Sequence, residues 1–112
     1  MITDLGLSRL TNHSKSLLTK GYISEDNNAL DPTDITVAQE ILTKTLSDIN
    51  SSGKTYTSLL NITTLEAIGD DIYRVGIKTE SDNLFSISIH PLIVKTGNEE
   101  ITYFFRIIVD RA

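Results

Sequence analysis

The C-terminal segment, residues 101–110, constrains the fold more than any other part of the chain. Its odd-numbered positions are all apolar: Ile101, Tyr103, Phe105, Ile107 and Val109. Successive side chains of a β-strand point to opposite faces, so a period of two gathers these residues on one face. The pattern predicts a strand that has one face in a hydrophobic core.

Three earlier segments show related patterns, and short polar turns connect them. They span residues 55–64, 72–79 and 84–95. Connections this short usually join antiparallel neighbours, so the four segments predict an antiparallel meander in chain order. The predicted core face of the last three strands holds Tyr73, Val75, Ile77, Phe85, Ile87, Ile89, Tyr103, Phe105 and Ile107.

Two helices are predicted ahead of the sheet. Residues 3–20 carry leucines spaced for one helical face and end at Lys20-Gly21. Residues 31–52 begin with Asp31 as an N-cap and proline at the first helical position. An apolar stripe follows, made of Ile35, Ala38, Leu42, Leu46 and Ile49. We therefore expect one α+β domain over residues 1–112, with two N-terminal helices followed by a four-stranded antiparallel meander sheet packed on the long second helix.

The amino-acid composition excludes several classes of protein. The 112 residues carry a formal net charge of −5 and no cysteine. The absence of cysteine excludes a disulfide framework, thiolate catalysis and cysteine-ligated metal sites. The negative charge disfavours nonspecific binding to nucleic acid or anionic membranes. No apolar run approaches the roughly 20 residues that span a bilayer, and the N-terminus lacks the pattern of a secretory signal. We expect a soluble protein, cytoplasmic or assembled in a virion, and not secreted through a signal peptide.

The motifs for catalysis or cofactor binding are incomplete. Gly53-Lys54-Thr55 resembles the end of a phosphate-binding loop, but the first glycine is missing and the predicted order is helix into strand. The acidic segment 25–34 lacks the glycine and the spacing of a calcium loop. His13 and His90 fall in different elements, without metal-ligand spacing or a serine nucleophile motif. We expect no enzymatic activity, no metal and no small-molecule cofactor.

The predicted outward face of the sheet is the one distinctive surface. It gathers Arg74, Lys78, Ser86, Ser88, His90, Thr102, Phe104, Arg106 and Ile108. Aromatic and arginine side chains are enriched at interface hot spots, and an exposed phenylalanine favours a contact surface. We predict a partner-binding site centred on Phe104 and Arg106, with Arg74, Lys78 and His90 around them. Two alternatives stay open: the N-terminal helix covers this face, or bases of a single strand stack on it.

Two architectures resemble this pattern. A long helix followed by an antiparallel meander resembles the cystatin-like architecture, although the inhibitory Gln-x-Val-x-Gly loop is absent. Residues 32–79 are similar to small baseplate wedge proteins of contractile tails, without the Pro-Arg signature after their helix or the Phe-Gly segment before it.

We therefore expect a non-enzymatic protein-interaction or assembly subunit, most concretely a small structural component of a phage-type virion or tail. Its partner would be another protein chain, including copies of itself, whereas nucleic acid is disfavoured and no membrane is involved. One alternative is a stand-alone inhibitor or immunity-type protein that masks a partner's surface. The other is a cystatin-like ligand-binding or nucleic-acid-binding domain.

Overall fold

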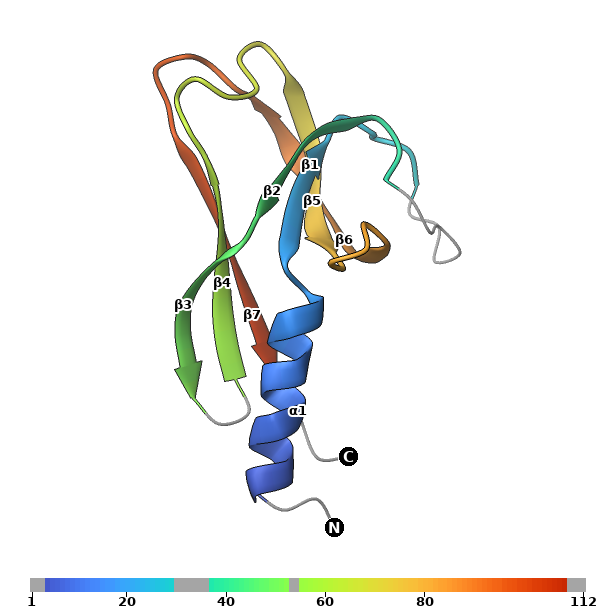
Figure 1. Ribbon diagram of the computed structural model, residues 1–112. Helices are drawn as coiled ribbons and strands as arrows, with labels where there is room; N and C mark the ends of the chain where they lie inside the picture. The colour runs from blue at the N-terminus through green and yellow to red at the C-terminus, as the bar shows by residue number, and fades with distance from the viewer. Residues whose placement is uncertain (1–3, 30–36, 53–54, 109–112) are drawn as a thin grey trace.

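The computed structural model describes residues 4–29, 37–52 and 55–108. These residues form one helix and two antiparallel sheets, so the chain is mostly β (Figure 1). The helix, α1, spans Asp4–Leu17. The strands are β1 (Lys20–Ser24), β2 (Glu40–Thr45), β3 (Ser47–Ser52), β4 (Thr55–Ile62), β5 (Asp71–Lys78), β6 (Leu84–Val94) and β7 (Ile101–Ile108).

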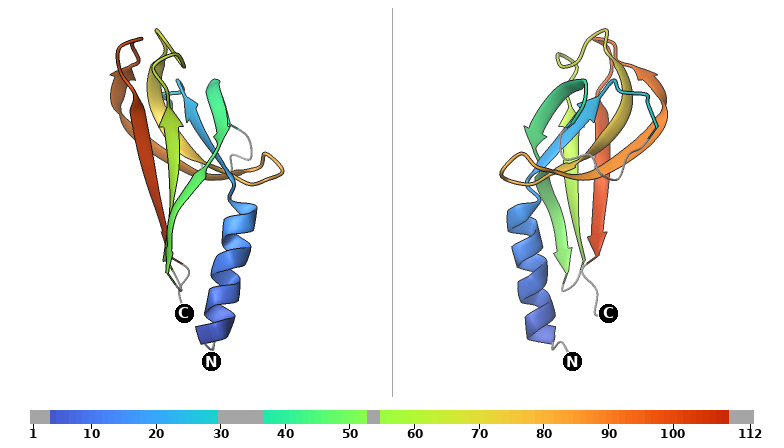
Figure 2. Two further views of the ribbon diagram at one scale, coloured as in Figure 1. Left: turned by 60° about the vertical axis from the view of Figure 1, so that its left-hand side comes forward. Right: turned by 90° about the vertical axis from the view of Figure 1, so that its right-hand side faces the viewer.

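One extended stretch of chain belongs to both sheets. The strand order is β2-β1-β5-β6 in the four-stranded sheet and β3-β4-β7 in the three-stranded sheet. Only Leu46 separates β2 from β3, and its amide donates to the Thr19 carbonyl at 2.8 Å. β2 and β3 can be treated as one long strand, whose first half belongs to the four-stranded sheet and whose second half belongs to the three-stranded sheet. The two sheets lie against each other, and α1 extends from one end of them (Figures 1 and 2).

The predicted second helix is wrong. Its residues 31–36 lie outside the described part of the chain, and the rest form a turn followed by β2 and β3. Gln39 has a φ of 50°, a left-handed conformation that interrupts a helix. The β-branched residues Ile41, Thr43 and Thr45 then favour a strand. β1 supplies the neighbour for that strand, in a register that runs from Lys20 opposite Thr45. Pairing with β1 outweighed the helical spacing of the leucines.

The predicted meander is also wrong, although its four strands exist at nearly the expected bounds as β4 to β7. β4 pairs with β3 and β7, whereas β5 pairs with β1 and β6. The connection 63–70 therefore carries the chain from one sheet to the other. The first helix, predicted over residues 3–20, ends at Leu17, and β1 begins at Lys20 and lies between β2 and β5. The predicted α+β class, with a single sheet packed on a long helix, is replaced by two sheets that pack on each other.

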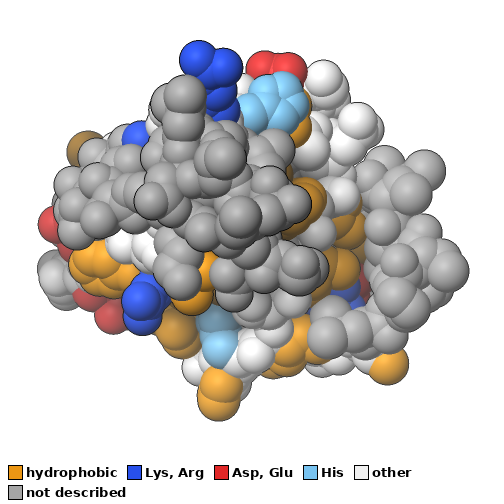
Figure 3. All heavy atoms as spheres, turned by 90° about the horizontal axis from the view of Figure 1, so that it is seen from below, with side chains coloured by type: hydrophobic (Ala, Val, Ile, Leu, Met, Phe, Trp, Pro, Cys, Tyr) orange, Lys and Arg blue, Asp and Glu red, His pale blue; other side chains and the backbone are white. Residues whose placement is uncertain are grey.

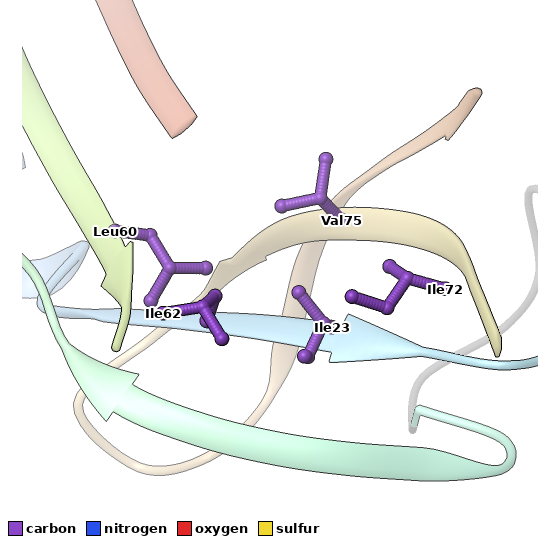
Figure 4. Close-up of a cluster of buried hydrophobic side chains, with 5 residues drawn as sticks. All are labelled: Ile23, Leu60, Ile62, Ile72 and Val75. Atoms are coloured by element: carbon purple, nitrogen blue, oxygen red, sulfur yellow. The ribbon is translucent and has the colours of Figure 1, made fainter. Parts of the chain in front are cut away.

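The core lies between the two sheets. Five buried side chains from β1, β4 and β5 form its centre: Ile23, Leu60, Ile62, Ile72 and Val75 (Figure 4). Tyr103 and Phe105 of β7 pack against this cluster and are partly buried. Burial of an aliphatic side chain contributes about 1.5–3 kcal/mol each. The cluster thus joins strands that are remote in the sequence.

The predicted inner face of β6 is wrong. Phe85 is 60% exposed and Ile89 is 47% exposed. Val75, a core residue, lies opposite Ser88, and directly opposite residues share a face of the sheet. Ser88 itself is exposed, and Ile93 packs against the core, so neither alternate set of β6 side chains faces inward along the whole strand. Register shifts between β5 and β6 accompany this change, and a shift by one residue exchanges the two faces of a strand.

An ion pair ties β2 to the connection 63–70 and makes stability depend on pH. Lys44 Nζ lies 2.7 Å from Glu66 Oε1, and the Thr63 amide donates to the same oxygen at 3.0 Å. The Lys44 hydrogen bond and then the Thr63 backbone hydrogen bond lower the pKa of Glu66 below its ordinary value of 4.5. A lowered folded-state pKa stabilises the fold above the unfolded-state pKa, and this contribution is lost as the pH falls through the folded-state value.

We therefore expect the Glu66→Gln variant to lose less stability than the parent chain when acidified from neutral pH to about pH 3. The share due to this partly exposed pair should be at most about 1 kcal/mol. Urea denaturation at the two pH values measures it. Glu80→Gln, in the exposed turn after β5, serves as the control. Equal acid sensitivity of the Glu66→Gln variant and the parent would contradict the prediction.

Candidate interaction surface

The outer side of the three-stranded sheet carries a large exposed aromatic side chain. Along β7 the odd-numbered side chains are half-buried and the even-numbered ones are exposed. Phe104 is 66% exposed. On β4, Leu59 lies opposite Phe104 and Thr57 lies opposite Arg106. We call this surface the outer β7 face; it consists of Thr57, Leu59, Thr102, Phe104, Arg106 and Ile108.

The helix contacts the other side of this sheet. The Ser14 Oγ and Tyr56 Oη atoms lie 2.8 Å apart, and Lys15 Nζ lies 5.9 Å from the centre of the Tyr56 ring. Tyr56 belongs to the buried series of β4, which points away from Leu59. The alternative in which the N-terminal helix covers Phe104 is therefore not the arrangement observed.

Arg74 and Lys78 lie in the other sheet and are buried, with exposures of 4% and 7%. Arg74 Nη1 is 3.4 Å from Asp26 Oδ2, and Nη2 donates to the Asn28 carbonyl at 2.6 Å. Lys78 pairs with Glu40 and also donates to Thr43 Oγ1 at 2.9 Å. Both cations hold parts of the chain together and do not reach the outer β7 face.

His90 belongs to β6, and its side chain contacts Tyr103 of β7. Its ring stacks on Tyr103, with ring centroids 5.7 Å apart and an interplanar angle of 22°. Burial raises the pKa of Tyr103 to about 12, so its hydroxyl stays protonated at neutral pH. That hydroxyl can donate to His90 Nε2, 3.0 Å away, while Nδ1 lies 2.7 Å from the Pro91 carbonyl. In one tautomer of the ring, Nδ1 donates to the Pro91 carbonyl and Nε2 accepts from the Tyr103 hydroxyl. His90 thus links the two strands from the inner side.

The five predicted site residues therefore do not share one face. The structure brings together Phe104 and Arg106 on the outer β7 face and places Arg74, Lys78 and His90 elsewhere. Within the described part of the chain, Arg106 makes no ion pair with a carboxylate. Among the residues that the structure describes, the outer β7 face thus presents an aromatic side chain beside a cation that has no carboxylate partner, Arg106.

Sequence reasoning missed an apolar groove of about 400 Å³ at the end of α1. Its apolar walls come from Leu17, Leu18, Phe85, Ile107 and Ile108, and His13, Ser14 and Thr79 complete the lining. Figure 3 views the molecule from the N-terminal end of α1 and shows apolar side chains exposed at several points. The sequence did not reveal this groove because its walls come from three elements that are distant in the sequence, and because Phe85 was predicted to lie in the core. Ile108 belongs both to this groove and to the outer β7 face.

Neither metal-binding clusters nor membrane-spanning helices occur among the described residues. Residues 4–29, 37–52 and 55–108 contain no group of three or more His, Asp or Glu side chains placed to hold a metal ion. Over the same residues, no helix has the length and apolar character needed to cross a bilayer. Comparison of the chain with models of protein families, with curated proteins and with solved structures found no match.

Proposed function

We propose that this chain is a non-enzymatic protein-interaction subunit that binds another protein through the outer β7 face. The observation that carries the proposal is the exposure of Phe104 beside Arg106, on a strand held in place by eight paired residues of β4. An aromatic side chain presented on a rigid strand loses little conformational entropy on binding, and aromatic and arginine residues dominate interface hot spots.

The electrostatic arrangement supports a partner with an acidic group beside an apolar pocket. The apolar pocket would bury Phe104, and a carboxylate at its rim would pair with Arg106. The chain as a whole carries a net charge of −5, whereas the cations Arg74 and Lys78 are already paired internally. Among the described residues of this face, Arg106 is therefore the cation that can recognise an acidic partner.

The most concrete form of this function is a structural subunit of a phage-type virion or tail. A stand-alone inhibitor that masks a partner's surface would use the same face. Light scattering of the purified chain separates the two, because an assembly subunit forms multimers and a masking inhibitor stays a monomer until its target is added.

We expect the Phe104→Ala/Arg106→Glu variant to lose its protein partners. Removing a hot-spot side chain costs about 2 kcal/mol or more, which weakens binding roughly 30-fold. Pull-down from cell extract, followed by titration of the captured partner, measures the loss. The control is Leu65→Ala/Arg9→Glu, which makes the same kinds of change at exposed positions outside the outer β7 face. Retention of every partner by the folded Phe104→Ala/Arg106→Glu variant would refute the proposal.

A further inference from the structure

β7 has a free edge in addition to its outer face. It lies at one end of the three-stranded sheet, and β4 pairs with it from Thr55 opposite Ile108 to Ile62 opposite Ile101. Among the described strands, none pairs with the other edge of β7. Figure 2 shows β7 at the outer side of its sheet in both views. The backbone donors and acceptors along this edge are available to another strand.

The other three sheet edges carry features that block strand addition. Pro91 and two register shifts interrupt β6. Both β2 and β3 contain a register shift against their single partner strand, and such irregularities twist an edge away from flat pairing. β7 has an unbroken register, no proline or glycine, and Arg106 as its single charge. A long, regular and apolar edge of this kind favours pairing with another chain.

The sequence of β7 is complementary to itself. In an antiparallel pair of two β7 strands with Phe105 on the twofold axis, Phe104 lies opposite Arg106 of the second copy. The Arg106 guanidinium can form a cation–π contact with the Phe104 ring, and the twofold symmetry produces this contact twice. On the inner side, Tyr103 lies opposite Ile107 of the second copy. Directly opposite residues share a face, so buried and exposed faces continue across the junction. A register centred on Arg106 would instead oppose two like charges.

We propose that two copies of this chain pair antiparallel through their β7 edges, with Phe105 on the twofold axis, and join two three-stranded sheets into one continuous sheet. This inference rests on the proposed function and deepens it, because it names a second copy as a partner of the assembly subunit.

The absence of cysteine from the chain makes disulfide cross-linking a direct test. In the proposed register, residue 102 lies opposite residue 108 of the second copy. Opposite Cα atoms in antiparallel pairs are about 4.5–5.5 Å apart, within the range of disulfides. The Thr102→Cys/Ile108→Cys variant should therefore form a linked dimer on mild oxidation, whereas Thr102→Cys alone should not. A linked dimer from Phe104→Cys alone, with none from the double variant, would overturn the Phe105-centred register.

Two variants with opposite charges at residue 104 test the same contact without oxidation. In the proposed register, Phe104→Glu faces Arg106 of the second copy and attracts it, whereas Phe104→Lys repels it. Cross-strand pairs contribute up to about 1 kcal/mol, and the twofold axis makes two of them. The dimer dissociation constant of the lysine variant should thus exceed that of the glutamate variant about tenfold or more in sedimentation equilibrium. Equal constants, or a parent chain that stays monomeric throughout, would overturn the inference.

These results separate the inference from the proposed function. A monomeric parent chain whose partners are lost on Phe104→Ala/Arg106→Glu replacement would refute pairing through β7 and leave the function standing. The opposite result is also informative. If the Thr102→Cys/Ile108→Cys variant forms the linked dimer, but the Phe104→Ala/Arg106→Glu variant keeps every other protein partner, pairing through β7 is supported. The outer β7 face is then refuted as the binding site for other proteins.

Discussion

Replacing Gly76 with alanine is expected to lower the free energy of unfolding by about 3 kcal/mol or more, at the upper end of overpacking effects. An added Cβ atom would overlap the Ser86 carbonyl oxygen and would lie 2.6 Å from the Tyr22 hydroxyl and 2.8 Å from its ring. Neither neighbour can move freely. The Ser86 oxygen belongs to the backbone of β6, and Tyr22 is buried with its hydroxyl donating to that same oxygen at 2.9 Å.

Urea denaturation of the Gly76→Ala variant measures this effect, and Gly97→Ala is the matched control. An added Cβ at Gly97 would meet Ile68 Cδ1 at 3.6 Å, an ordinary contact, and its φ is not in the left-handed region. We expect the control to change stability by less than about 1 kcal/mol. Similar losses in the two variants would show that Tyr22 does not pack against Gly76 as described.

Replacing Asp26 with alanine is expected to cost about 3–5 kcal/mol, because it leaves the buried Arg74 guanidinium without its carboxylate. The side chains of Arg74 and Asp26 are 5% and 7% exposed, so water cannot replace the lost partner. Arg74 Nε already lacks a hydrogen-bond partner among the described atoms. Asp26 also accepts the Asn28 amide at 2.9 Å, so the same change loosens the segment that covers Arg74.

Two further variants test whether the charge itself causes this loss. Adding Arg74→Met to the Asp26 variant removes the unpaired cation and should recover part of the stability. Asp82→Asn removes the charge from the exposed pair with Lys20, whose atoms lie 2.7 Å apart, and keeps a residue type that tolerates the left-handed φ of 65°. It should have a far smaller effect because exposed pairs contribute little. If the double variant is no more stable than Asp26→Ala alone, the loss comes from the loop and not from the buried charge.

The sequence by itself determined the local pattern of several elements. The alternation in residues 55–64 and 101–110 identified β4 and β7, and in β7 it also identified which side chains point inward. The leucines of the N-terminal segment identified α1, although it ends at Leu17 and leads directly into a strand. Phe104 and Arg106 were placed on one exposed face because a period of two acts within a single strand and needs no partner.

Only the tertiary structure decided the rest, because pairing depends on neighbours that a linear pattern does not name. Residues 40–52 carry leucines spaced for a helix and threonines suited to a strand, and pairing with β1 selected the strand. In β6, alternation predicted Phe85 and Ile89 in the core, yet register shifts against β5 interrupt the alternation and leave both side chains exposed. Arg74 and Lys78 became internal because Asp26 and Glu40, distant in the sequence, were brought beside them. A buried cation requires a partner, and only the packed chain supplies it.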